Sequence, residues 1–147
     1  MRLVDKILPQ TSRTEQINAL LDAQRICLKN GLTTIDDAGL SKNTLLLIDS
    51  LNKSKDLKIR IYGMISNDNE SVNYFLNRGK LKTDHLNVRS VKEYGDGALG
   101  SRGATLKKPY SDDIHNYGKL ITGPKEIVEL AKKLAEADFQ MNTHAIG

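Results

Sequence analysis

Apolar and polar residues follow two different periods along this chain. Four segments repeat apolar residues at helical spacing, and these helices are expected over residues 11–31, 41–54, 69–79 and 123–138. Four other segments are β-branched or alternate with period two, and these strands are expected over residues 32–38, 57–65, 87–94 and 139–144. Alternating helices and strands predict a parallel sheet covered by helices, either doubly wound or a (β/α)₈ barrel.

Residues at the predicted helix ends support these boundaries. Ser12 precedes the first helix and Glu15 follows three positions later, which is the pattern of a capping box. Ser41 is the expected cap of the second helix, Gly79 ends the third, and Pro124 lies near the first turn of the fourth. The inward face of the first helix is expected to consist of Ile17, Leu20, Leu21, Gln24 and Leu28, with Cys27 beside them.

The segment "VKEYGDGALGSRGA" (91–104) contains a G-x-G-x-x-G pattern directly after a predicted strand. A dinucleotide-binding turn needs a helix that opens at the third glycine, and here the next helix starts only after Gly123. We therefore interpret residues 96–121 as an active-site loop at the carboxyl end of a strand. The loop is expected to be the most mobile part of the chain, with Gly97, Gly100 and Gly103 as its flexible points.

Composition excludes several function classes. The chain has 147 residues, a net charge of +4, 39% apolar and 27% charged residues, and its basic residues are scattered without interleaved aromatics, so no nucleic-acid partner is expected. Its apolar runs are shorter than the roughly 20 residues of a membrane span, so no membrane partner is expected. A signal peptide is not apparent, and a cytoplasmic location is favoured. Cys27 is the single cysteine and is expected to be a buried apolar residue.

Chemistry-bearing side chains occur near the ends of the third and fourth predicted strands. Alternation places Val88, Ser90, Lys92 and Tyr94 on one face of strand 87–94, and Gln140, Asn142 and His144 on one face of strand 139–144. A strand lysine is costly to bury unless it is paired or modified, and Lys92 could pair with Asp96. His144 could bind a metal or substrate, or it could be an ordinary hydrogen-bonded core histidine.

Three segments together resemble a known family. "GLTTIDDAG", "VKEYGDGALGSRGATLKKPYSDD" and "FQMNTHAIG" are similar, in this order and at this separation, to the YtcJ-like branch of the metal-dependent amidohydrolase superfamily. The resemblance covers residues 3–147 and implies a (β/α)₈ TIM barrel. The four predicted strands then correspond to barrel strands two to five, so that residues 1–147 form one α/β domain that is a partial barrel.

The resemblance also implies a set of site residues. Lys92 takes the position of the strand-four ligand, a carboxylated lysine in many members, and His144 takes that of the strand-five metal-ligand histidine. Asp96, Arg102 and Tyr110 are expected to bind substrate from the loop, although Arg102 could instead pair with Asp96 or Asp112. The implied activity is hydrolysis of an amide or related non-peptide C–N bond in a small molecule, with a divalent metal for which zinc is expected.

The chain departs from the family pattern in one large respect. It lacks the strand-one His-x-His, and 147 residues are fewer than the roughly 250 of a closed barrel. We therefore expect a fragment that is inactive by itself and binds zinc weakly or not at all. It is also expected to self-associate, either by strand addition at its open sheet edges or by the meeting of two half-barrels. A non-catalytic structural or interaction fragment is the alternative.

Overall fold

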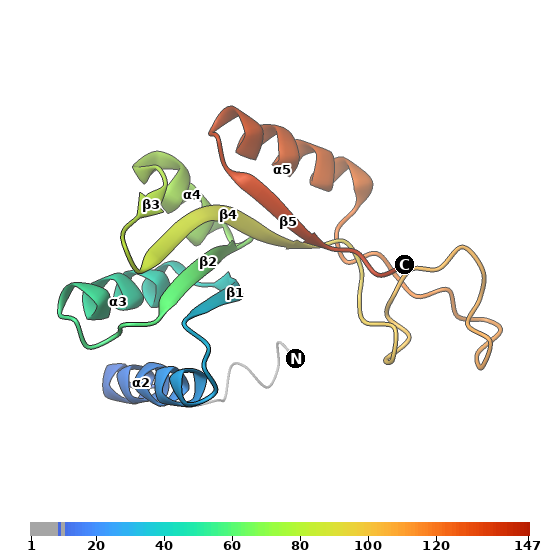
Figure 1. The fold of residues 1–147 in the computed structure, drawn as a ribbon. Coiled ribbons are helices and arrows are strands. Elements are labelled where there is room, and N and C mark those ends of the chain that lie inside the picture. The colour runs from blue at the N-terminus through green and yellow to red at the C-terminus, as the bar shows by residue number, and fades with distance from the viewer. Residues whose placement is uncertain (1–8, 10) are drawn as a thin grey trace.

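The computed structural model describes Pro9 and residues 11–147 of the chain. Figure 1 shows one curved sheet with helices along its outer side. The strands are β1 (Thr34–Leu40), β2 (Arg60–Ser66), β3 (Leu81–Lys82), β4 (Leu86–Tyr94) and β5 (Gln140–His144). The helices are α2 (Arg13–Lys29), α3 (Lys42–Lys53), α4 (Asn69–Arg78) and α5 (Pro124–Glu136). All four long strands run parallel, and the two-residue β3 is antiparallel to the start of β4.

The helix boundaries are set by the predicted local contacts. The Glu15 N–H donates to Ser12 Oγ (3.3 Å) and the Ser12 N–H donates to the Glu15 carboxylate (2.7 Å), which confirms the capping box of α2. Ser41 caps α3 through the backbone of Thr44. Gly79 follows α4 with φ +88°, a value that favours glycine, and thereby ends the helix.

Strand order and burial distinguish the two predicted architectures. The parallel strands lie in the order β1-β2-β4-β5 without the reversal of a doubly wound sheet. One sheet face packs on the helices, and its apolar core includes Leu45 and Ile48 of α3, Phe75 of α4, Ile61 and Ile65 of β2, and Val91 of β4. The other face is polar and partly exposed. A sheet covered on one side, with strands in sequence order, has the arrangement of part of a (β/α)₈ barrel.

A bulge in β4 changes which side chains share a face. The register between β2 and β4 shifts after Asn87, so that β4 has one extra residue. Val88 therefore turns to the helix side, where a Cβ built on Gly63 would lie 3.7 Å from its Cγ2. The prediction that Val88 shares a face with Lys92 is wrong, whereas Ser90 and Lys92 both lie on the polar face.

Helix α2 is less deeply buried than its apolar pattern predicts. Leu28 is 45% exposed, within a stretch from residue 28 to 34 that is exposed throughout, so its predicted inward position is wrong. Cys27 is half-buried against the core. Gln24 attaches α2 to the segment before β2, because its side-chain amide donates to the Asp56 carbonyl (3.1 Å) and its side-chain oxygen accepts from the Ile59 N–H (3.0 Å).

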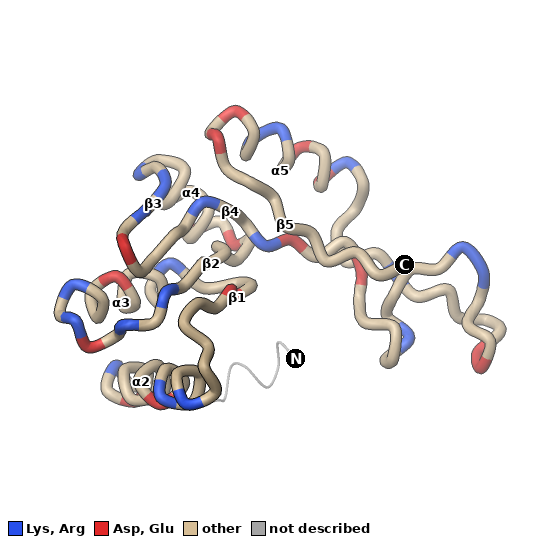
Figure 2. The backbone as a smooth tube through the Cα atoms, in the orientation of Figure 1, with Lys and Arg blue, Asp and Glu red and all other residues tan. Residues whose placement is uncertain are grey.

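Charges of both signs are spread over the helices, strands and loops, as Figure 2 shows along the backbone. In the part of the chain that the structure describes, no helix is both long enough and apolar enough to cross a bilayer. The expected absence of a nucleic-acid partner stays a prediction.

We expect the chain to self-associate through the open edge of β1, which has no strand partner on its outer side among the described residues. Light scattering after size exclusion should give a mass above the 16.3 kDa of one chain, rising with protein concentration. Ala38→Lys adds a charge to exposed β1 and should shift the equilibrium toward monomer. Ala23→Lys, the same change on exposed α2, should leave it unchanged. A monomer at every concentration would contradict the prediction.

Candidate functional site at the carboxyl ends of β4 and β5

Lys92 and His144 lie on the same face and at the same end of the sheet. The register pairs Lys92 with Asn142 and Tyr94 with His144, so the two candidate ligands are diagonal neighbours on adjacent strands. Strand spacing and rise place such Cα atoms about 8 Å apart. This common position agrees with the sequence expectation, while the role of both residues as metal ligands stays a prediction.

The Lys92 side chain is half-buried on the polar face. Its Nζ donates to the Glu93 carbonyl oxygen (3.2 Å) and lies 4.2 Å from the centre of the Tyr94 ring. The alternative in which Lys92 pairs with Asp96 is wrong, because Lys92 Nζ donates to the Glu93 carbonyl and the Asp96 oxygens accept from backbone N–H groups. The ammonium is thus held by a carbonyl and an aromatic ring.

His144 contacts the start of the long loop. Its Nε2 lies 3.4 Å from the Gly97 carbonyl oxygen, and its ring centre lies 5.8 Å from that of Tyr94. A carbonyl can only accept a hydrogen bond, so a hydrogen bond in this contact requires a proton on Nε2. In the neutral ring with that tautomer, Nδ1 is the atom that has a lone pair for another ligand. His144 is half-buried at the strand end and is not enclosed in the core.

A cavity of about 370 Å³ opens beside Lys92. It is lined by Gly39, Ser66, Asn67, Asp68, Lys92, Glu93, Tyr94, Ile121 and Thr122. Glu93 is 3% exposed and accepts hydrogen bonds from the Tyr94 N–H (2.7 Å), the Thr122 hydroxyl (2.8 Å) and the Asn67 side-chain amide. Sequence reasoning missed Glu93, because its position in the strand gives no sign of partners 26 and 29 residues away.

Asp96 is buried at the first turn of the loop, with 3% exposure. Its carboxylate accepts from the N–H groups of Thr105 (2.9 Å), Ile146 (3.0 Å) and Gly147 (2.8 Å). The donors at Ile146 and Thr105 contribute most to lowering the pKa of Asp96. Asp96 therefore connects the start of the loop to Thr105 within the loop and to the segment after β5. Its expected contact with substrate stays a prediction.

Arg102 and Tyr110 have different surroundings in the loop. Arg102 forms a two-point contact with Asp112 (Nη2–Oδ2 2.9 Å, Nε–Oδ1 3.3 Å), so of its possible acidic partners the structure selects Asp112. Its side chain keeps 45% exposure. Tyr110 is buried, and its hydroxyl donates to the Ala104 carbonyl oxygen (2.9 Å). Of these two candidates, only Arg102 is open to a ligand in this arrangement.

The loop from residue 96 to 121 closes on itself through backbone contacts. The Gly97 N–H donates to the Gly103 carbonyl (3.0 Å), and the Gly103 N–H donates to the Ala98 carbonyl (2.9 Å). A Cβ on Gly97 would lie 3.0 Å from Gly103 Cα, whereas one on Gly100 would meet nothing within 4 Å. Gly97 and Gly103 are thus sites of close backbone approach, which differs from their expected role as flexible points. These contacts and the Thr105 bond to Asp96 favour a more rigid loop than the sequence predicts.

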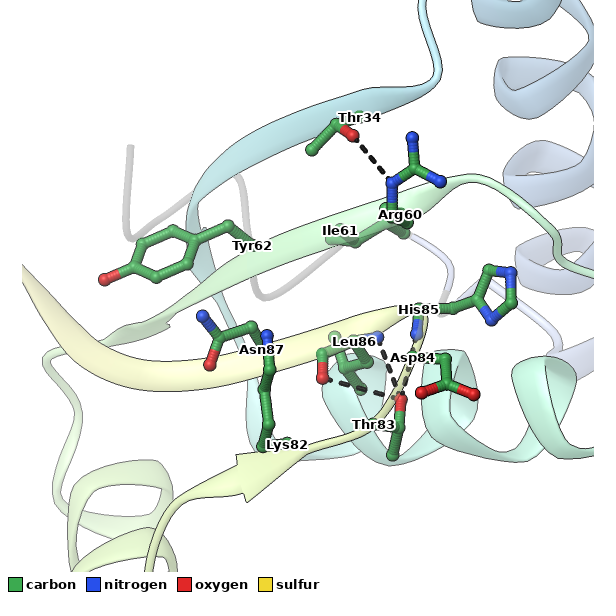
Figure 3. A pocket seen from close by; sticks show the side chains of 10 residues that line it. All are labelled: Thr34, Arg60, Ile61, Tyr62, Lys82, Thr83, Asp84, His85, Leu86 and Asn87. Atoms are coloured by element: carbon green, nitrogen blue, oxygen red, sulfur yellow. Dashed lines mark hydrogen bonds between the residues drawn. The ribbon is translucent and has the colours of Figure 1, made fainter.

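A second cavity, of about 280 Å³, lies at the opposite ends of the strands (Figure 3). Arg60 and His85 contribute to it, and the Arg60 Nε donates to the Thr34 hydroxyl (3.0 Å). Parallel barrels carry their chemistry at the carboxyl ends of the strands, so the cavity beside Lys92 is the better candidate site.

The donor set for a metal is incomplete among the residues that the structure describes. No group of three or more His, Cys, Asp or Glu side chains gathers around a common point in Pro9 and residues 11–147. A catalytic zinc normally takes three protein ligands and a water. Lys92 and His144 would supply at most two of these ligands, and their role as metal ligands stays a prediction.

Two solved structures described as metal-dependent hydrolases share this fold. The crystal structure of an uncharacterized metal-dependent hydrolase from Pyrococcus horikoshii OT3 superposes with a TM-score of 0.86 at 24% identity, over 93% of this chain and 28% of that chain. A second, from Pyrococcus furiosus, gives 0.83 at 24% identity, over 99% and 31%. At this identity the likeness shows the fold, which is a partial α/β TIM barrel.

Sequence comparison assigns the family. The profile described as "Amidohydrolase family" matches residues 1–147, and this chain belongs to that family. Protein LONG AFTER FAR-RED 3 of Arabidopsis thaliana is 28% identical over 100% of this chain and 27% of its own length. YtcJ of Bacillus subtilis (strain 168), whose name provisionally calls it an amidohydrolase, is 33% identical over 53% of this chain and 15% of its own length. The chain thus spans about a quarter or less of these relatives.

Gly97→Ala should destabilise the loop, because the new methyl group would contact the backbone of Gly103, which cannot shift without distorting the loop. We expect a loss of about 1–3 kcal/mol in the free energy of unfolding, typical of overpacking. Gly100→Ala is the matched control and should be neutral within about 1 kcal/mol. Urea unfolding of both variants makes the comparison. Equal stability of the two variants would show that the close approach does not exist.

Proposed function

We propose that this chain is part of a hydrolase that cleaves an amide or related non-peptide C–N bond in a small molecule, with a divalent metal, for which zinc is the leading choice. The observation that carries the proposal is the common position of Lys92 and His144 at the carboxyl ends of β4 and β5, in a chain of the amidohydrolase family. A divalent metal held there supplies Lewis-acid activation of water and of the substrate carbonyl.

Lys92 suits carboxylation, because its amine has no carboxylate partner among the described residues and lies next to an open cavity. In that modification the neutral amine attacks carbon dioxide, an N–C bond forms, and one proton leaves the nitrogen. The product carries a negative charge and two oxygen donors, which replace a cation that is costly to bury. In the isolated chain, where the other ligands are absent from the described residues, we expect Lys92 to remain an unmodified amine.

His144 provides the second donor. With Nε2–H directed at the Gly97 carbonyl, the neutral ring presents Nδ1 as its lone-pair atom, and a metal-ligating histidine commonly uses its other N–H in this way. The loop therefore contributes to the ligand set by orienting a histidine that belongs to the neighbouring strand.

Substrate would enter from the side of the loop and the 370 Å³ cavity. Arg102 is the exposed candidate that could bind a carboxylate or carbonyl group of the substrate in a two-point contact, in exchange for Asp112. Asp96 and Tyr110 are the other two proposed substrate residues, and both would first have to give up their present backbone partners.

The isolated chain is proposed to be catalytically inactive, because Lys92 and His144 alone are fewer than the three protein ligands of a catalytic zinc. A purely structural or interacting role is the alternative. It differs from the main proposal in one respect: a longer polypeptide that contains all the barrel strands would still bind no metal at this site.

Calorimetric titration with Zn²⁺ tests the proposal in two samples, this chain and a longer polypeptide in which a relative supplies the remaining barrel strands. We expect weak binding or none by the chain, and stoichiometric binding by the longer protein, together with zinc-dependent release of amine from small acyl amides. His144→Ala in the longer protein should weaken zinc binding by roughly 100-fold or more, because a direct ligand is lost.

The matched control is His115→Ala, which removes an exposed loop histidine and should leave the affinity unchanged. Tight zinc binding by the 147-residue chain that survives His144→Ala would refute the assignment of this site. Absence of zinc binding in the longer protein would favour the structural role.

A further inference from the structure

The Asp96 carboxylate joins three segments that are distant in sequence. Its Oδ1 accepts from Ile146, and its Oδ2 accepts from Thr105 and Gly147, so one buried side chain receives donors from the far side of the loop and from the segment after β5. Only acceptors fit here, because all three partners are N–H donors. An ionised carboxylate satisfies all three donors at once.

The three segments are in close contact around Asp96. A Cβ on Gly147 would lie 2.0 Å from the Thr105 carbonyl oxygen, so a side chain at this position would collide with the loop. On the other side of Asp96, the Gly95 N–H donates to the His144 carbonyl (2.9 Å). The His144 carbonyl is therefore held by the Gly95 N–H, and the backbone two and three residues after His144 is held by the Asp96 carboxylate.

The side chain of His144 is oriented by the same arrangement. The residue directly after Asp96 is Gly97, whose carbonyl oxygen is the partner of His144 Nε2. The carbonyl is in turn placed by the bonds that close the loop between Gly97 and Gly103. Release of Asp96 would free both the backbone after His144 and the loop that carries its hydrogen-bond acceptor.

We propose that Asp96 is a positioning residue: by binding the Thr105, Ile146 and Gly147 N–H groups it locks the β4–α5 loop onto the end of β5 and fixes the side-chain orientation of His144. This inference rests on the proposed function, in which His144 is a ligand. It gives Asp96 a role through His144, in place of the substrate contact expected from the family resemblance.

Asp96→Asn is the sharpest test, because it keeps the volume but replaces one oxygen with an NH₂ group that faces an N–H donor. Nuclear magnetic resonance of the 147-residue chain, without metal, measures the three-bond couplings of His144 across χ1. These couplings should report one staggered rotamer in the wild-type chain and averaging over rotamers in Asp96→Asn. If Asp96 contributed only to the overall stability of the chain, Asp96→Asn would lower the free energy of unfolding and leave the His144 rotamer of the folded chain unchanged.

Asp112→Asn is the matched control, since it makes the same change in the same loop at an exposed residue whose side-chain partner is Arg102. It should keep the wild-type couplings. Ile146→Pro is the second variant: it removes one of the three donors at an exposed position and leaves Asp96 intact. It should also release His144, and it keeps the test available if Asp96→Asn fails to fold.

Unchanged His144 couplings in a folded Asp96→Asn chain, or in Ile146→Pro, would overturn the inference, as would rotamer averaging in the wild type. Because no metal is present, this result is independent of the zinc titration. Failure of zinc binding would refute the proposed function and leave the positioning of His144 standing, whereas unchanged couplings would refute the positioning alone.

Discussion

The bonds of the Asp96 carboxylate to three backbone N–H groups are the interaction on which the site end of this structure depends. Strands β4 and β5 bring Lys92 and His144 to the same face, but strand pairing does not fix the segments beyond the strand ends. Asp96 does so, because it is buried and bonded to Thr105 within the loop and to Ile146 beyond β5. The loop from residue 96 to 121 thereby becomes part of the candidate site.

The sequence predicted the elements that depend on local contacts. Helix ends at Ser12, Ser41 and Gly79 follow from capping within a few residues, and the order of helices and strands follows from periodicity. The side of the sheet on which Lys92 lies also follows, because it depends only on alternation close to the strand end. The family resemblance correctly indicated a partial barrel.

Features that depend on distant partners were not predictable in this way. The β4 bulge that turns Val88 toward the helices arises from pairing with β2, and simple alternation cannot reveal it. Strand β3 is two residues long and has no periodic signal. The Asp96 partners at Ile146 and Gly147 are 50 and 51 residues away. The sequence therefore indicated an acidic residue in the loop, but it did not indicate the role of that residue.

Hydrogen exchange of the wild-type chain tests most directly whether Asp96 makes the loop and the β5 end one unit. We expect the amides of Thr105, Ile146 and Gly147 to be protected to about the same degree as the hydrogen-bonded amides of β2, because each donates to a buried carboxylate that joins the loop to the segment after β5. Free exchange of these three amides while β2 remains protected would contradict it.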